Sequence, residues 1–528
     1  MTADWLVQTF FVAGSPGAFF VQLATLITLI VLSLLAATEL PSLISWARSE
    51  SRVAGGLFAL MALGAALRLA APASQMDIHY RLSAAEVHVS LAKSAYGLAF
   101  GSVVRSLWWL TGPSDASVHN FNVVAGVVSI GLLFALARAL GLSTIGAFAA
   151  AALLAFNPTH AIFSHTDNQT ILEIALTLWG IRSLVVPTGP RQRLIAGLAL
   201  GLAAVLRPDA LAVIAVAIVV WALVGRPLSR WDGLLAVGLV LVAPNLAAWA
   251  GLAMDGSTMS QAFTRDVVSQ YGWRHFLFLR MEWSHWLVPI GMALAFFDVD
   301  RRRLVVGTAL IALALSVAVP GFSLAALAHA GARHQLRAIP FAAVWGAIGL
   351  AWAVAKLEER TPAAVPIAVF AGALATVPVV PYTVAQTSLS AEYALYRDHI
   401  TEVPRGCQII GFFDMLSSDL SLKPPRQLSR QLELDHRWID LELEPMPEDG
   451  CRVYFRGASC YASGVTKAYA EQSSDGALEA QERCRLAEAR LNLEPLHVEN
   501  IIGRSHGTDH YPPESHMEVG FFTVRGAR

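Results

Sequence analysis

The sequence contains little charge. Only 15% of its 528 residues are Asp, Glu, Lys or Arg, whereas soluble proteins carry about a quarter. Hydrophobic residues make up 55% of the chain, and the mean hydropathy is +0.53. This balance indicates a membrane protein. The net charge is −1 and no Lys/Arg-rich patch with interleaved aromatic residues occurs, so we expect no nucleic-acid partner.

Cysteine is absent from residues 1–384, and all four cysteines lie in residues 385–528. They are Cys407, Cys451, Cys460 and Cys484. An even number of cysteines in one polar segment indicates disulfides and an oxidising compartment. Four cysteines allow three pairings, and the sequence does not choose among them. Four unpaired thiols are the alternative, and the lack of a C-x-x-C spacing disfavours a zinc site.

Long apolar segments alternate with short polar loops over residues 1–384. Backbone groups in lipid must bond within their own segment, so each apolar segment is predicted to be a helix. The segments are 17–38, 53–71, 121–140, 144–163, 170–186, 194–224, 233–253, 284–297, 304–320, 339–355 and 363–384. At about 20 residues per crossing, they predict an α-helical polytopic bundle with about ten crossings.

The segment 194–224 is too long for one crossing and too short for two. Arg207-Pro208-Asp209 divides it, and proline disfavours helix at the preceding residue. We therefore predict a broken, re-entrant pair of helices with its apex near the outer side. A broken helix at membrane depth lines a cavity or is buried in protein.

The charge of the short loops predicts the orientation of the bundle. Compact loops rich in Lys and Arg are typical of the cytoplasmic side. They are WARSESR, RSLVVPTGPRQR, GRPLSR, DVDRRR and KLEER. The other loops then lie outside the cytoplasm, as does the cysteine-bearing segment 385–528. Loop charge and cysteine placement are independent observations, and both place this segment outside the cytoplasm.

Two regions outside the apolar segments have structure of their own. The outer loop 73–120 is predicted to hold interfacial helices, because an amphipathic stretch follows Asp77 and GSVVRSLWWLTG adds paired tryptophans. Residues 385–528 are predicted to form an extracytoplasmic α/β domain. Its expected strands are CQIIGFF, CRVYFRG and MEVGFFTVR, and its expected helix is DGALEAQERCRLAEARL.

Ionisable residues at the outer ends of the predicted helices are candidates for function, because charge is costly there. They are Arg68, Asp77, His79, Arg81, His165, Asp167, Arg207, Asp209, Arg333, His334 and Arg337. They come from separate loops, yet the topology places them at one level. Arg333 and Arg337, four residues apart on one helical face, are alternatively interfacial anchors.

Other members of this group also have structural explanations. Asp77 and Asp167 each precede a predicted helix and are alternatively helix caps. Arg68 stands at a helix end, where arginine extends its head group to water. Arg207 is alternatively a buried partner of Asp209.

Five stretches in a fixed order carry a resemblance to a known family. They are ALRLAAPASQMD, GSVVRSLWWLTGPSDASVHNFNVVAGVVSIGLLFALARALG, AAALLAFNPTHAIFSHTDNQTILEIALTLW, AGLALGLAAVLRPDAL and ARHQLRAIPFAAVWGAIGL. Together, over roughly residues 53–355, they resemble the GT-C glycosyltransferases, especially protein mannosyltransferases and the lipid A aminoarabinose transferase. The chain departs from the family in three places: Ile78 follows Asp77 where many members have a second acid, the family's His-Pro-Pro is missing, and His334 replaces a tyrosine.

The resemblance implies an inverting transfer of a sugar from a polyprenyl-phosphate carrier to an extracytoplasmic glycan, lipid or protein acceptor. It implies that Asp77 is the catalytic general base and that arginines hold the phosphate. The candidate substrate-binding residues are His79, Arg81, His165, Asp167, Arg207, Arg333, His334 and Arg337. No metal or cofactor is expected, and DVD at 298–300 is discounted as a metal motif because three arginines follow it on the cytoplasmic side.

Two other functions share parts of this pattern. A lipid or sugar transporter, or a flippase, also has many helices and a broken helix, although the sequence shows no inverted repeat. An O-antigen ligase or polymerase uses lipid-linked sugar with a different order of motifs.

Overall fold

The computed structural model describes residues 16–74, 98–112, 114–186, 189–206, 215, 219–220, 231–238, 240–243, 284–321, 336–385, 388–411, 432–438, 451–461, 480–503 and 515–525. The chain divides into two compact units, which we describe separately. The first unit holds the described residues up to Ala70 and those from Leu98 to Val384. The second unit holds Ala71–Ser74 and the described residues from Ala385 onward.

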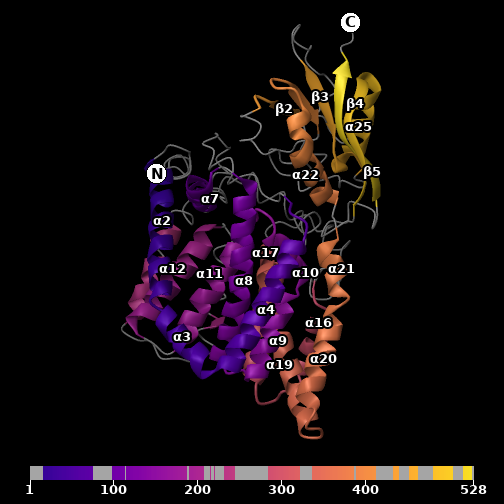
Figure 1. Cartoon of the computed structure of the whole chain (residues 1–528). Coiled ribbons are helices and arrows are strands. Elements are labelled where there is room, and N and C mark those ends of the chain that lie inside the picture. Colours follow the sequence, from indigo (N-terminus) through magenta and orange to yellow (C-terminus); the bar gives the residue numbers. More distant parts are fainter. Residues whose placement is uncertain are drawn as a thin grey trace. The chain divides into compact units, whose positions relative to one another are not determined.

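The first unit is helical (Figure 1). Its described helices are α2 (Pro16–Ala37), α3 (Leu40–Ser49), α4 (Ser51–Ala70), α7 (Leu98–Thr111), α8 (Asp115–Ala139), α9 (Thr144–Ala155), α10 (Pro158–Ser164), α11 (Thr170–Val185), α12 (Pro190–Leu206), η1 (Asp232–Leu235), α16 (Leu287–Ala295), α17 (Arg302–Gly321), η5 (Leu336–Ala338), α19 (Ile339–Glu358), α20 (Ala364–Thr376) and α21 (Val379–Val384). The described parts of the predicted apolar segments are mainly helical, with a break at Phe156 and Asn157, and α7 confirms a helix at GSVVRSLWWLTG.

Several of these helices are long and apolar enough to cross a membrane. Within the described residues there are five, namely Phe20–Ser49, Ser51–Ala70, Asp115–Ala139, Leu336–Glu358 and Ala364–Val384. The pair α9 and α10, bent by 58°, is a sixth if it forms one span. The protein is therefore a helical membrane protein, and its described residues hold five or six apolar spans. The prediction of about ten crossings stays a prediction, and the apex at Arg207 lies outside the described residues.

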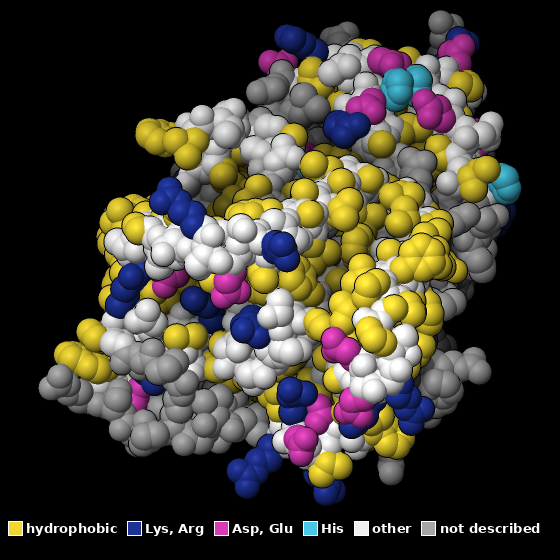
Figure 2. Space-filling model, turned by 60° about the horizontal axis from the view of Figure 1, so that its bottom comes forward, with side chains coloured by type: hydrophobic (Ala, Val, Ile, Leu, Met, Phe, Trp, Pro, Cys, Tyr) yellow, Lys and Arg dark blue, Asp and Glu magenta, His cyan; other side chains and the backbone are white. Residues whose placement is uncertain are grey.

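The outer surface of the helices is apolar. On α20, Val369 and Phe370 expose 68% and 66% of their surface, and on α2 Leu34 exposes 63%. Figure 2 shows hydrophobic side chains covering a broad part of the visible side, with most Lys, Arg, Asp and Glu side chains around the margins of this area. Large exposed apolar surfaces are avoided in soluble monomers, so this face is suited to lipid.

Loops predicted to share the cytoplasmic side contact one another. Glu39, between α2 and α3, lies 3.8 Å from Arg182 and 3.7 Å from Arg191, near the two ends of the α11–α12 turn. Arg193 Nε forms a buried ion pair of 2.7 Å with Asp232 Oδ1 at the start of η1. These contacts place three separate polar turns at one end of the helical unit.

Helices α16 and α19 approach closely because glycines line their contact. A Cβ built on Gly349 would lie 2.9 Å from the backbone carbon of Leu294 and would also collide with the carbonyl oxygen of Gly291. Small residues allow such close backbone packing in membrane helices, where van der Waals contact holds helices together.

We expect Gly349→Ala to push α16 and α19 apart and to destabilise the protein by about 1–3 kcal/mol, the usual cost of overpacking. Thermal unfolding in detergent, followed by tryptophan fluorescence, measures this effect. Gly372→Ala on α20 is the matched control, because nothing lies within 4 Å of the added methyl group. Equal unfolding temperatures for the two variants would contradict the assigned packing.

The second unit contains a five-stranded mixed sheet. Its elements are α22 (Ser388–His399), η6 (Ile400–Glu402), β1 (Gln408–Gly411), β2 (Asp435–Trp438), β3 (Arg452–Arg456), η7 (Ala458–Tyr461), α25 (Ala480–Arg490), β4 (Asn492–Gly503) and β5 (Ser515–Arg525). The strand order is β2-β1-β3-β5-β4, with β1 parallel to β2 and β3 and the other pairs antiparallel. The three strands and the helix predicted here are present, whereas β2, β4 and α22 were not predicted.

Alternating side chains build a core on each face of this sheet. Ile409 and Phe455 pack with Tyr396 of α22, whereas Ile410 and Tyr454 pack with Ala487 of α25. This is the period of two that a strand imposes on its side chains. The two helices therefore cover opposite faces of the sheet.

Both pairs of cysteines form disulfides, Cys407–Cys451 and Cys460–Cys484. The first joins the residues that precede β1 and β3, and the second joins η7 to α25. The predicted disulfides are confirmed, and the pairing is one of the three that the sequence left open.

Candidate functional site

Arg68 lies inside the helical unit near the end of α4, with none of its surface exposed. Its Nη1 donates to the carbonyl oxygens of Gly64 at 2.8 Å and Ala155 at 3.0 Å. Its Nη2 donates to Leu154 O at 3.3 Å and lies 2.7 Å from His160 Nδ1. The interpretation of Arg68 as extending its head group to water is therefore wrong, because the guanidinium satisfies backbone carbonyls inside the protein.

The carbonyls of Leu154 and Ala155 are available to Arg68 because α9 ends there, at a break before α10. The sequence predicted one helix over 144–163, but the chain bends by 58° at Phe156 and Asn157. Asn157 Oδ1 then caps α10 by accepting from the N–H of His160 at 2.8 Å. Pro158 at the first position of α10 explains the break, since its ring cannot continue the hydrogen-bond ladder of α9.

A buried polar turn follows α10. Residues Thr166–Thr170 are all buried, including Asp167 at 1% exposure. Asn122 of α8 holds the turn, because its Nδ2 donates to the carbonyl oxygens of Thr166 at 2.8 Å and Asn168 at 3.0 Å. Asn168 Oδ1 in turn accepts from the N–H of Thr170 at 2.8 Å, which forms an Asx turn that leads into α11. Asp167 is thus carried on a turn fixed from both sides.

His165 stands where α10 ends and is partly buried. Its ring meets the buried His119 of α8 edge to face, with ring centroids 6.0 Å apart. The two candidate residues His165 and Asp167 are therefore brought together on one turn, against the N-terminal half of α8.

Arg337 of η5 is buried and makes a bidentate ion pair with Glu173, in the first turn of α11. Arg337 Nη2 lies 2.6 Å from Glu173 Oε2, and Nε lies 2.5 Å from Oε1. The side chains are 5% and 1% exposed. A small cavity of about 10 Å³, close to the volume that one water requires, adjoins the pair and is otherwise lined mainly by apolar side chains of α11, α17 and α19. Removing either partner would leave an uncompensated buried charge.

The remaining predicted site residues cannot be placed. Asp77, His79, Arg81, Arg207, Arg333 and His334 lie outside the described residues. Of the candidates, the structure places His165 and Asp167 on one turn. It places Arg337 against Glu173, which lies about one helical turn into α11, the helix that follows this turn.

Three contributors to this region were not predicted, namely Asn122, His160 and Glu173. Glu173 carries the clearest signal, because a lone acid in the apolar stretch TILEIALTLW is costly unless it is paired. Asn122 and His160 are polar residues within apolar helices, and nothing in the sequence shows which backbone groups they bond.

The DVD sequence at 298–300 has a structural role at its first position. Asp298 is buried and accepts from the backbone N–H of Arg301 at 3.2 Å and from Arg301 Nη1 at 2.9 Å. This carboxylate therefore fixes the turn between α16 and α17.

In the second unit, a polar network links β3 to α25. Tyr454 Oη donates to Glu488 Oε1 at 2.8 Å, and the same oxygen accepts from Arg456 Nε at 2.8 Å. Burial, with the nearby Glu488 carboxylate, raises the pKa of Tyr454 well above its usual range. Tyr454 is therefore a fixed hydrogen-bond donor that joins sheet and helix.

Comparison with known proteins bears on the segment that carries the buried polar turn Thr166–Thr170. The family model described as dolichyl-phosphate-mannose-protein mannosyltransferase matches residues 103–247. The predicted resemblance is confirmed over this segment. It contains Asn122, His165, Asp167 and Glu173, whereas Arg68 and Arg337 lie outside it. No curated protein matches the sequence.

Solved structures of membrane glycosyltransferases are weakly similar. ArnT from Cupriavidus metallidurans, bound to undecaprenyl phosphate, shares 13% identity over 90% of this chain and 98% of its own, with a TM-score of 0.46. Arabinofuranosyltransferase AftD from mycobacteria shares 16% identity over 89% of this chain and 41% of the AftD chain, with a TM-score of 0.44. Oligosaccharyltransferase AglB from Archaeoglobus fulgidus, in complex with an inhibitory peptide and a dolichol-phosphate, shares 13% sequence identity. The match covers 77% of this chain and 61% of the AglB chain, with a TM-score of 0.42. Similarity at this level transfers no residue role, and this chain spans between 49% and 61% of the AglB chain in the structures it matches.

We expect Arg337→Met to destabilise the protein by about 3–5 kcal/mol, because Glu173 is left as an unpaired buried charge. The double variant Glu173→Leu/Arg337→Met removes both charges and is expected to recover most of that loss. Thermal unfolding in detergent measures both effects.

Lys356→Met is the matched control for this prediction. Lys356 pairs with Glu359 at 2.7 Å, but the two side chains are 54% and 62% exposed, so its loss is expected to cost at most about 1 kcal/mol. A double variant no more stable than Arg337→Met would contradict the assigned pairing.

Proposed function

We propose that the protein is an inverting glycosyltransferase that moves a sugar from a polyprenyl-phosphate carrier to an extracytoplasmic glycan, lipid or protein acceptor. The observation that carries the proposal is the buried polar turn Thr166–Thr170 within the segment 103–247 that matches the mannosyltransferase model. Apolar residues would hold the ends of α10 and α11 at lower cost. A buried acid on a turn braced by Asn122 is therefore best explained by a reaction.

The chemistry requires a base on the acceptor hydroxyl and positive charge on the departing phosphate. We assign the base to Asp77, which follows the end of α4, because the donor tail stays in lipid while the acceptor arrives from water. Arg207 and Arg333 are assigned to the phosphate, since guanidinium groups match it in a fork.

Arg337 has a more limited part in this scheme. Its Nε and Nη2 are engaged by Glu173, so we assign it to fixing the chain that carries Arg333 and His334. Asp167 and His165 are assigned to orienting the sugar or the acceptor. His79 and Arg81 are assigned to the donor side, close to Asp77 in the sequence.

The proposed domain organisation follows the predicted topology. Residues 1–384 form the transmembrane glycosyltransferase domain, with interfacial helices in the loop 73–120, and residues 385–528 form an extracytoplasmic domain. The two disulfides support an oxidising compartment for the latter. The bacterial inner membrane is the location that fits both.

We expect the purified protein to release polyprenyl phosphate from a polyprenyl-phosphate sugar when an envelope extract supplies the acceptor. Mass spectrometry detects the released lipid. Asp77→Asn is expected to lower this turnover at least about a hundredfold while donor binding persists, because general-base assistance is worth about 10²–10⁴-fold.

Asp300→Asn is the matched control, since Asp300 is an exposed acid at the turn between α16 and α17. Near-normal turnover by Asp77→Asn would assign the base elsewhere, with Asp167 the next candidate. Movement of intact lipid-linked sugar across vesicles without cleavage would instead identify a transporter.

We expect intact cells to label the C-terminal domain with a membrane-impermeant maleimide only after treatment with an impermeant phosphine, which reduces its disulfides. Ser49→Cys, exposed at the α3–α4 turn, is the control and is expected to react only after permeabilisation. Reactive domain cysteines without reduction, or protection of the domain until permeabilisation, would overturn the proposed orientation.

A further inference from the structure

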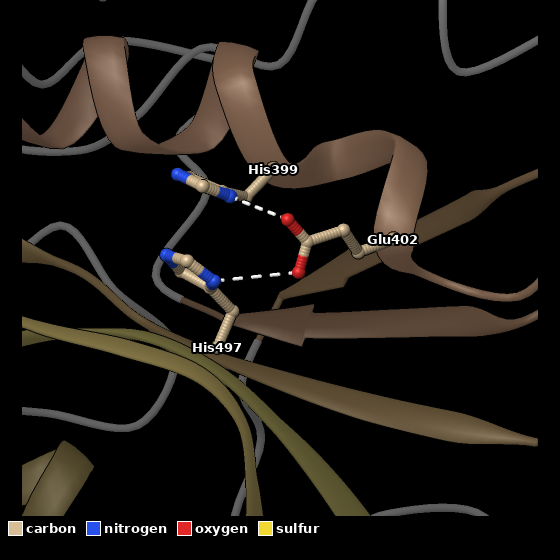
Figure 3. A group of neighbouring side chains, drawn as sticks. All are labelled: His399, Glu402 and His497. Atoms are coloured by element: carbon tan, nitrogen blue, oxygen red, sulfur yellow. Dashed lines mark hydrogen bonds and ion pairs between the residues drawn. The ribbon is translucent and has the colours of Figure 1, made fainter.

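A cluster of two histidines and two glutamates lies on the second unit, between η6 and β4. His399 Nδ1 is 2.6 Å from Glu402 Oε1, and His497 Nδ1 is 3.3 Å from Glu402 Oε2 (Figure 3). The two imidazole rings are stacked, with centroids 3.4 Å apart and planes 18° apart. Glu402 thus faces the Nδ1 edge of both rings.

A second carboxylate faces the opposite edge of the same rings. Glu499 Oε1 lies 3.1 Å from His497 Nε2 and 3.5 Å from His399 Nε2. The stacked histidines are therefore flanked by one carboxylate at each nitrogen edge.

Local structure explains how the four side chains meet. His399 caps η6 and Glu402 ends it, so one tight turn brings both to the same side. His497 and Glu499 are two apart on β4 and share one face of that strand. Figure 3 shows His399 and Glu402 approaching from the helical turn and His497 from the strand beneath.

The hydrogen-bond inventory of the cluster does not balance with neutral rings. A neutral imidazole has one N–H and one lone pair, whereas both nitrogens of each ring face a carboxylate oxygen. A metal ion at the Nδ1 edge would use one lone pair of each ring and would leave an N–H at each Nε2 to face Glu499.

We propose that His399 Nδ1, His497 Nδ1 and a Glu402 oxygen bind one divalent transition-metal ion, with zinc as the best fit. These three ligand atoms lie within 4.8 Å of one another. A tetrahedral zinc ion with bonds of about 2.0–2.2 Å needs ligand atoms about 3.3 Å apart. The two rings, which are stacked in the structure, must turn so that both Nδ1 lone pairs point at the ion. The metal takes both Nδ1 lone pairs, and both Nε2–H groups then donate to Glu499.

Glu499 has the position expected of a carboxylate that supports metal-binding histidines. Such an acid fixes the ring orientation and raises the basicity of the coordinating nitrogen. Two imidazoles and one carboxylate suit zinc and neighbouring transition metals better than magnesium or calcium, which prefer oxygen ligands. The side chains are 24% to 49% exposed, so water completes the fourth position.

The test uses the full-length protein in detergent, stripped with a chelator, re-equilibrated with zinc chloride and passed through gel filtration. Elemental analysis and titration calorimetry are expected to show that the parent protein binds about one more zinc per chain than the double variant His399→Ala/His497→Ala. With magnesium chloride in place of zinc chloride, the two proteins are expected to show no such difference. Glu499→Gln is expected to keep the site but weaken zinc binding about 10–100-fold.

His516→Ala is the matched control, because His516 is exposed on the neighbouring β5 and lies outside the cluster. It is expected to bind zinc like the parent protein. Glu402→Gln, which preserves shape, serves if the double histidine variant fails to fold, and it is expected to lose the tight zinc site. Equal zinc content and affinity in the parent protein and in either cluster variant would overturn the proposal.

Discussion

The buried guanidinium of Arg68 is the interaction on which the helical unit depends most. A charge this deep is costly unless it has partners, and here the two terminal nitrogens, Nη1 and Nη2, bond the carbonyl oxygens of Gly64, Leu154 and Ala155 and approach His160. The carbonyls of Leu154 and Ala155 are available because α9 ends there, at the break before α10. The same break turns α10 so that it ends at the polar turn carrying Asp167. Loss of Arg68 would therefore remove the donors that bond the last carbonyls of α9, and it would also displace the polar turn that carries Asp167.

The sequence predicted elements whose signal is local. Apolar length predicted the spans, and alternating hydrophobicity predicted β1, β3 and β5. The edge strand β4 was missed because LEPLHVEN mixes charge with a proline and lacks clean alternation. Candidate residues were found by their charge, but their partners were not. Arg337 pairs with Glu173, which is 164 residues away in the sequence, and Arg68 turns inward. Both outcomes depend on tertiary packing, which no local sequence pattern encodes.

The two units are stabilised by different means. The helical unit packs through glycine contacts such as Gly349 against α16 and through buried polar bonds, because water is not there to drive helices together. The second unit has an ordinary apolar core on both faces of a sheet, reinforced by two covalent links. Cysteine is confined to the second unit because only there does the chain rely on oxidation.

The order in which the cysteines pair has a consequence for biosynthesis. Cys407 joins Cys451 and Cys460 joins Cys484, so the first cysteine bonds the second, the third bonds the fourth, and neither loop encloses or crosses the other. A chain that enters an oxidising compartment from its N-terminal side exposes the first pair before the second has emerged. Oxidation during translocation then yields the native connectivity directly, and maturation of this membrane protein should not require a disulfide isomerase.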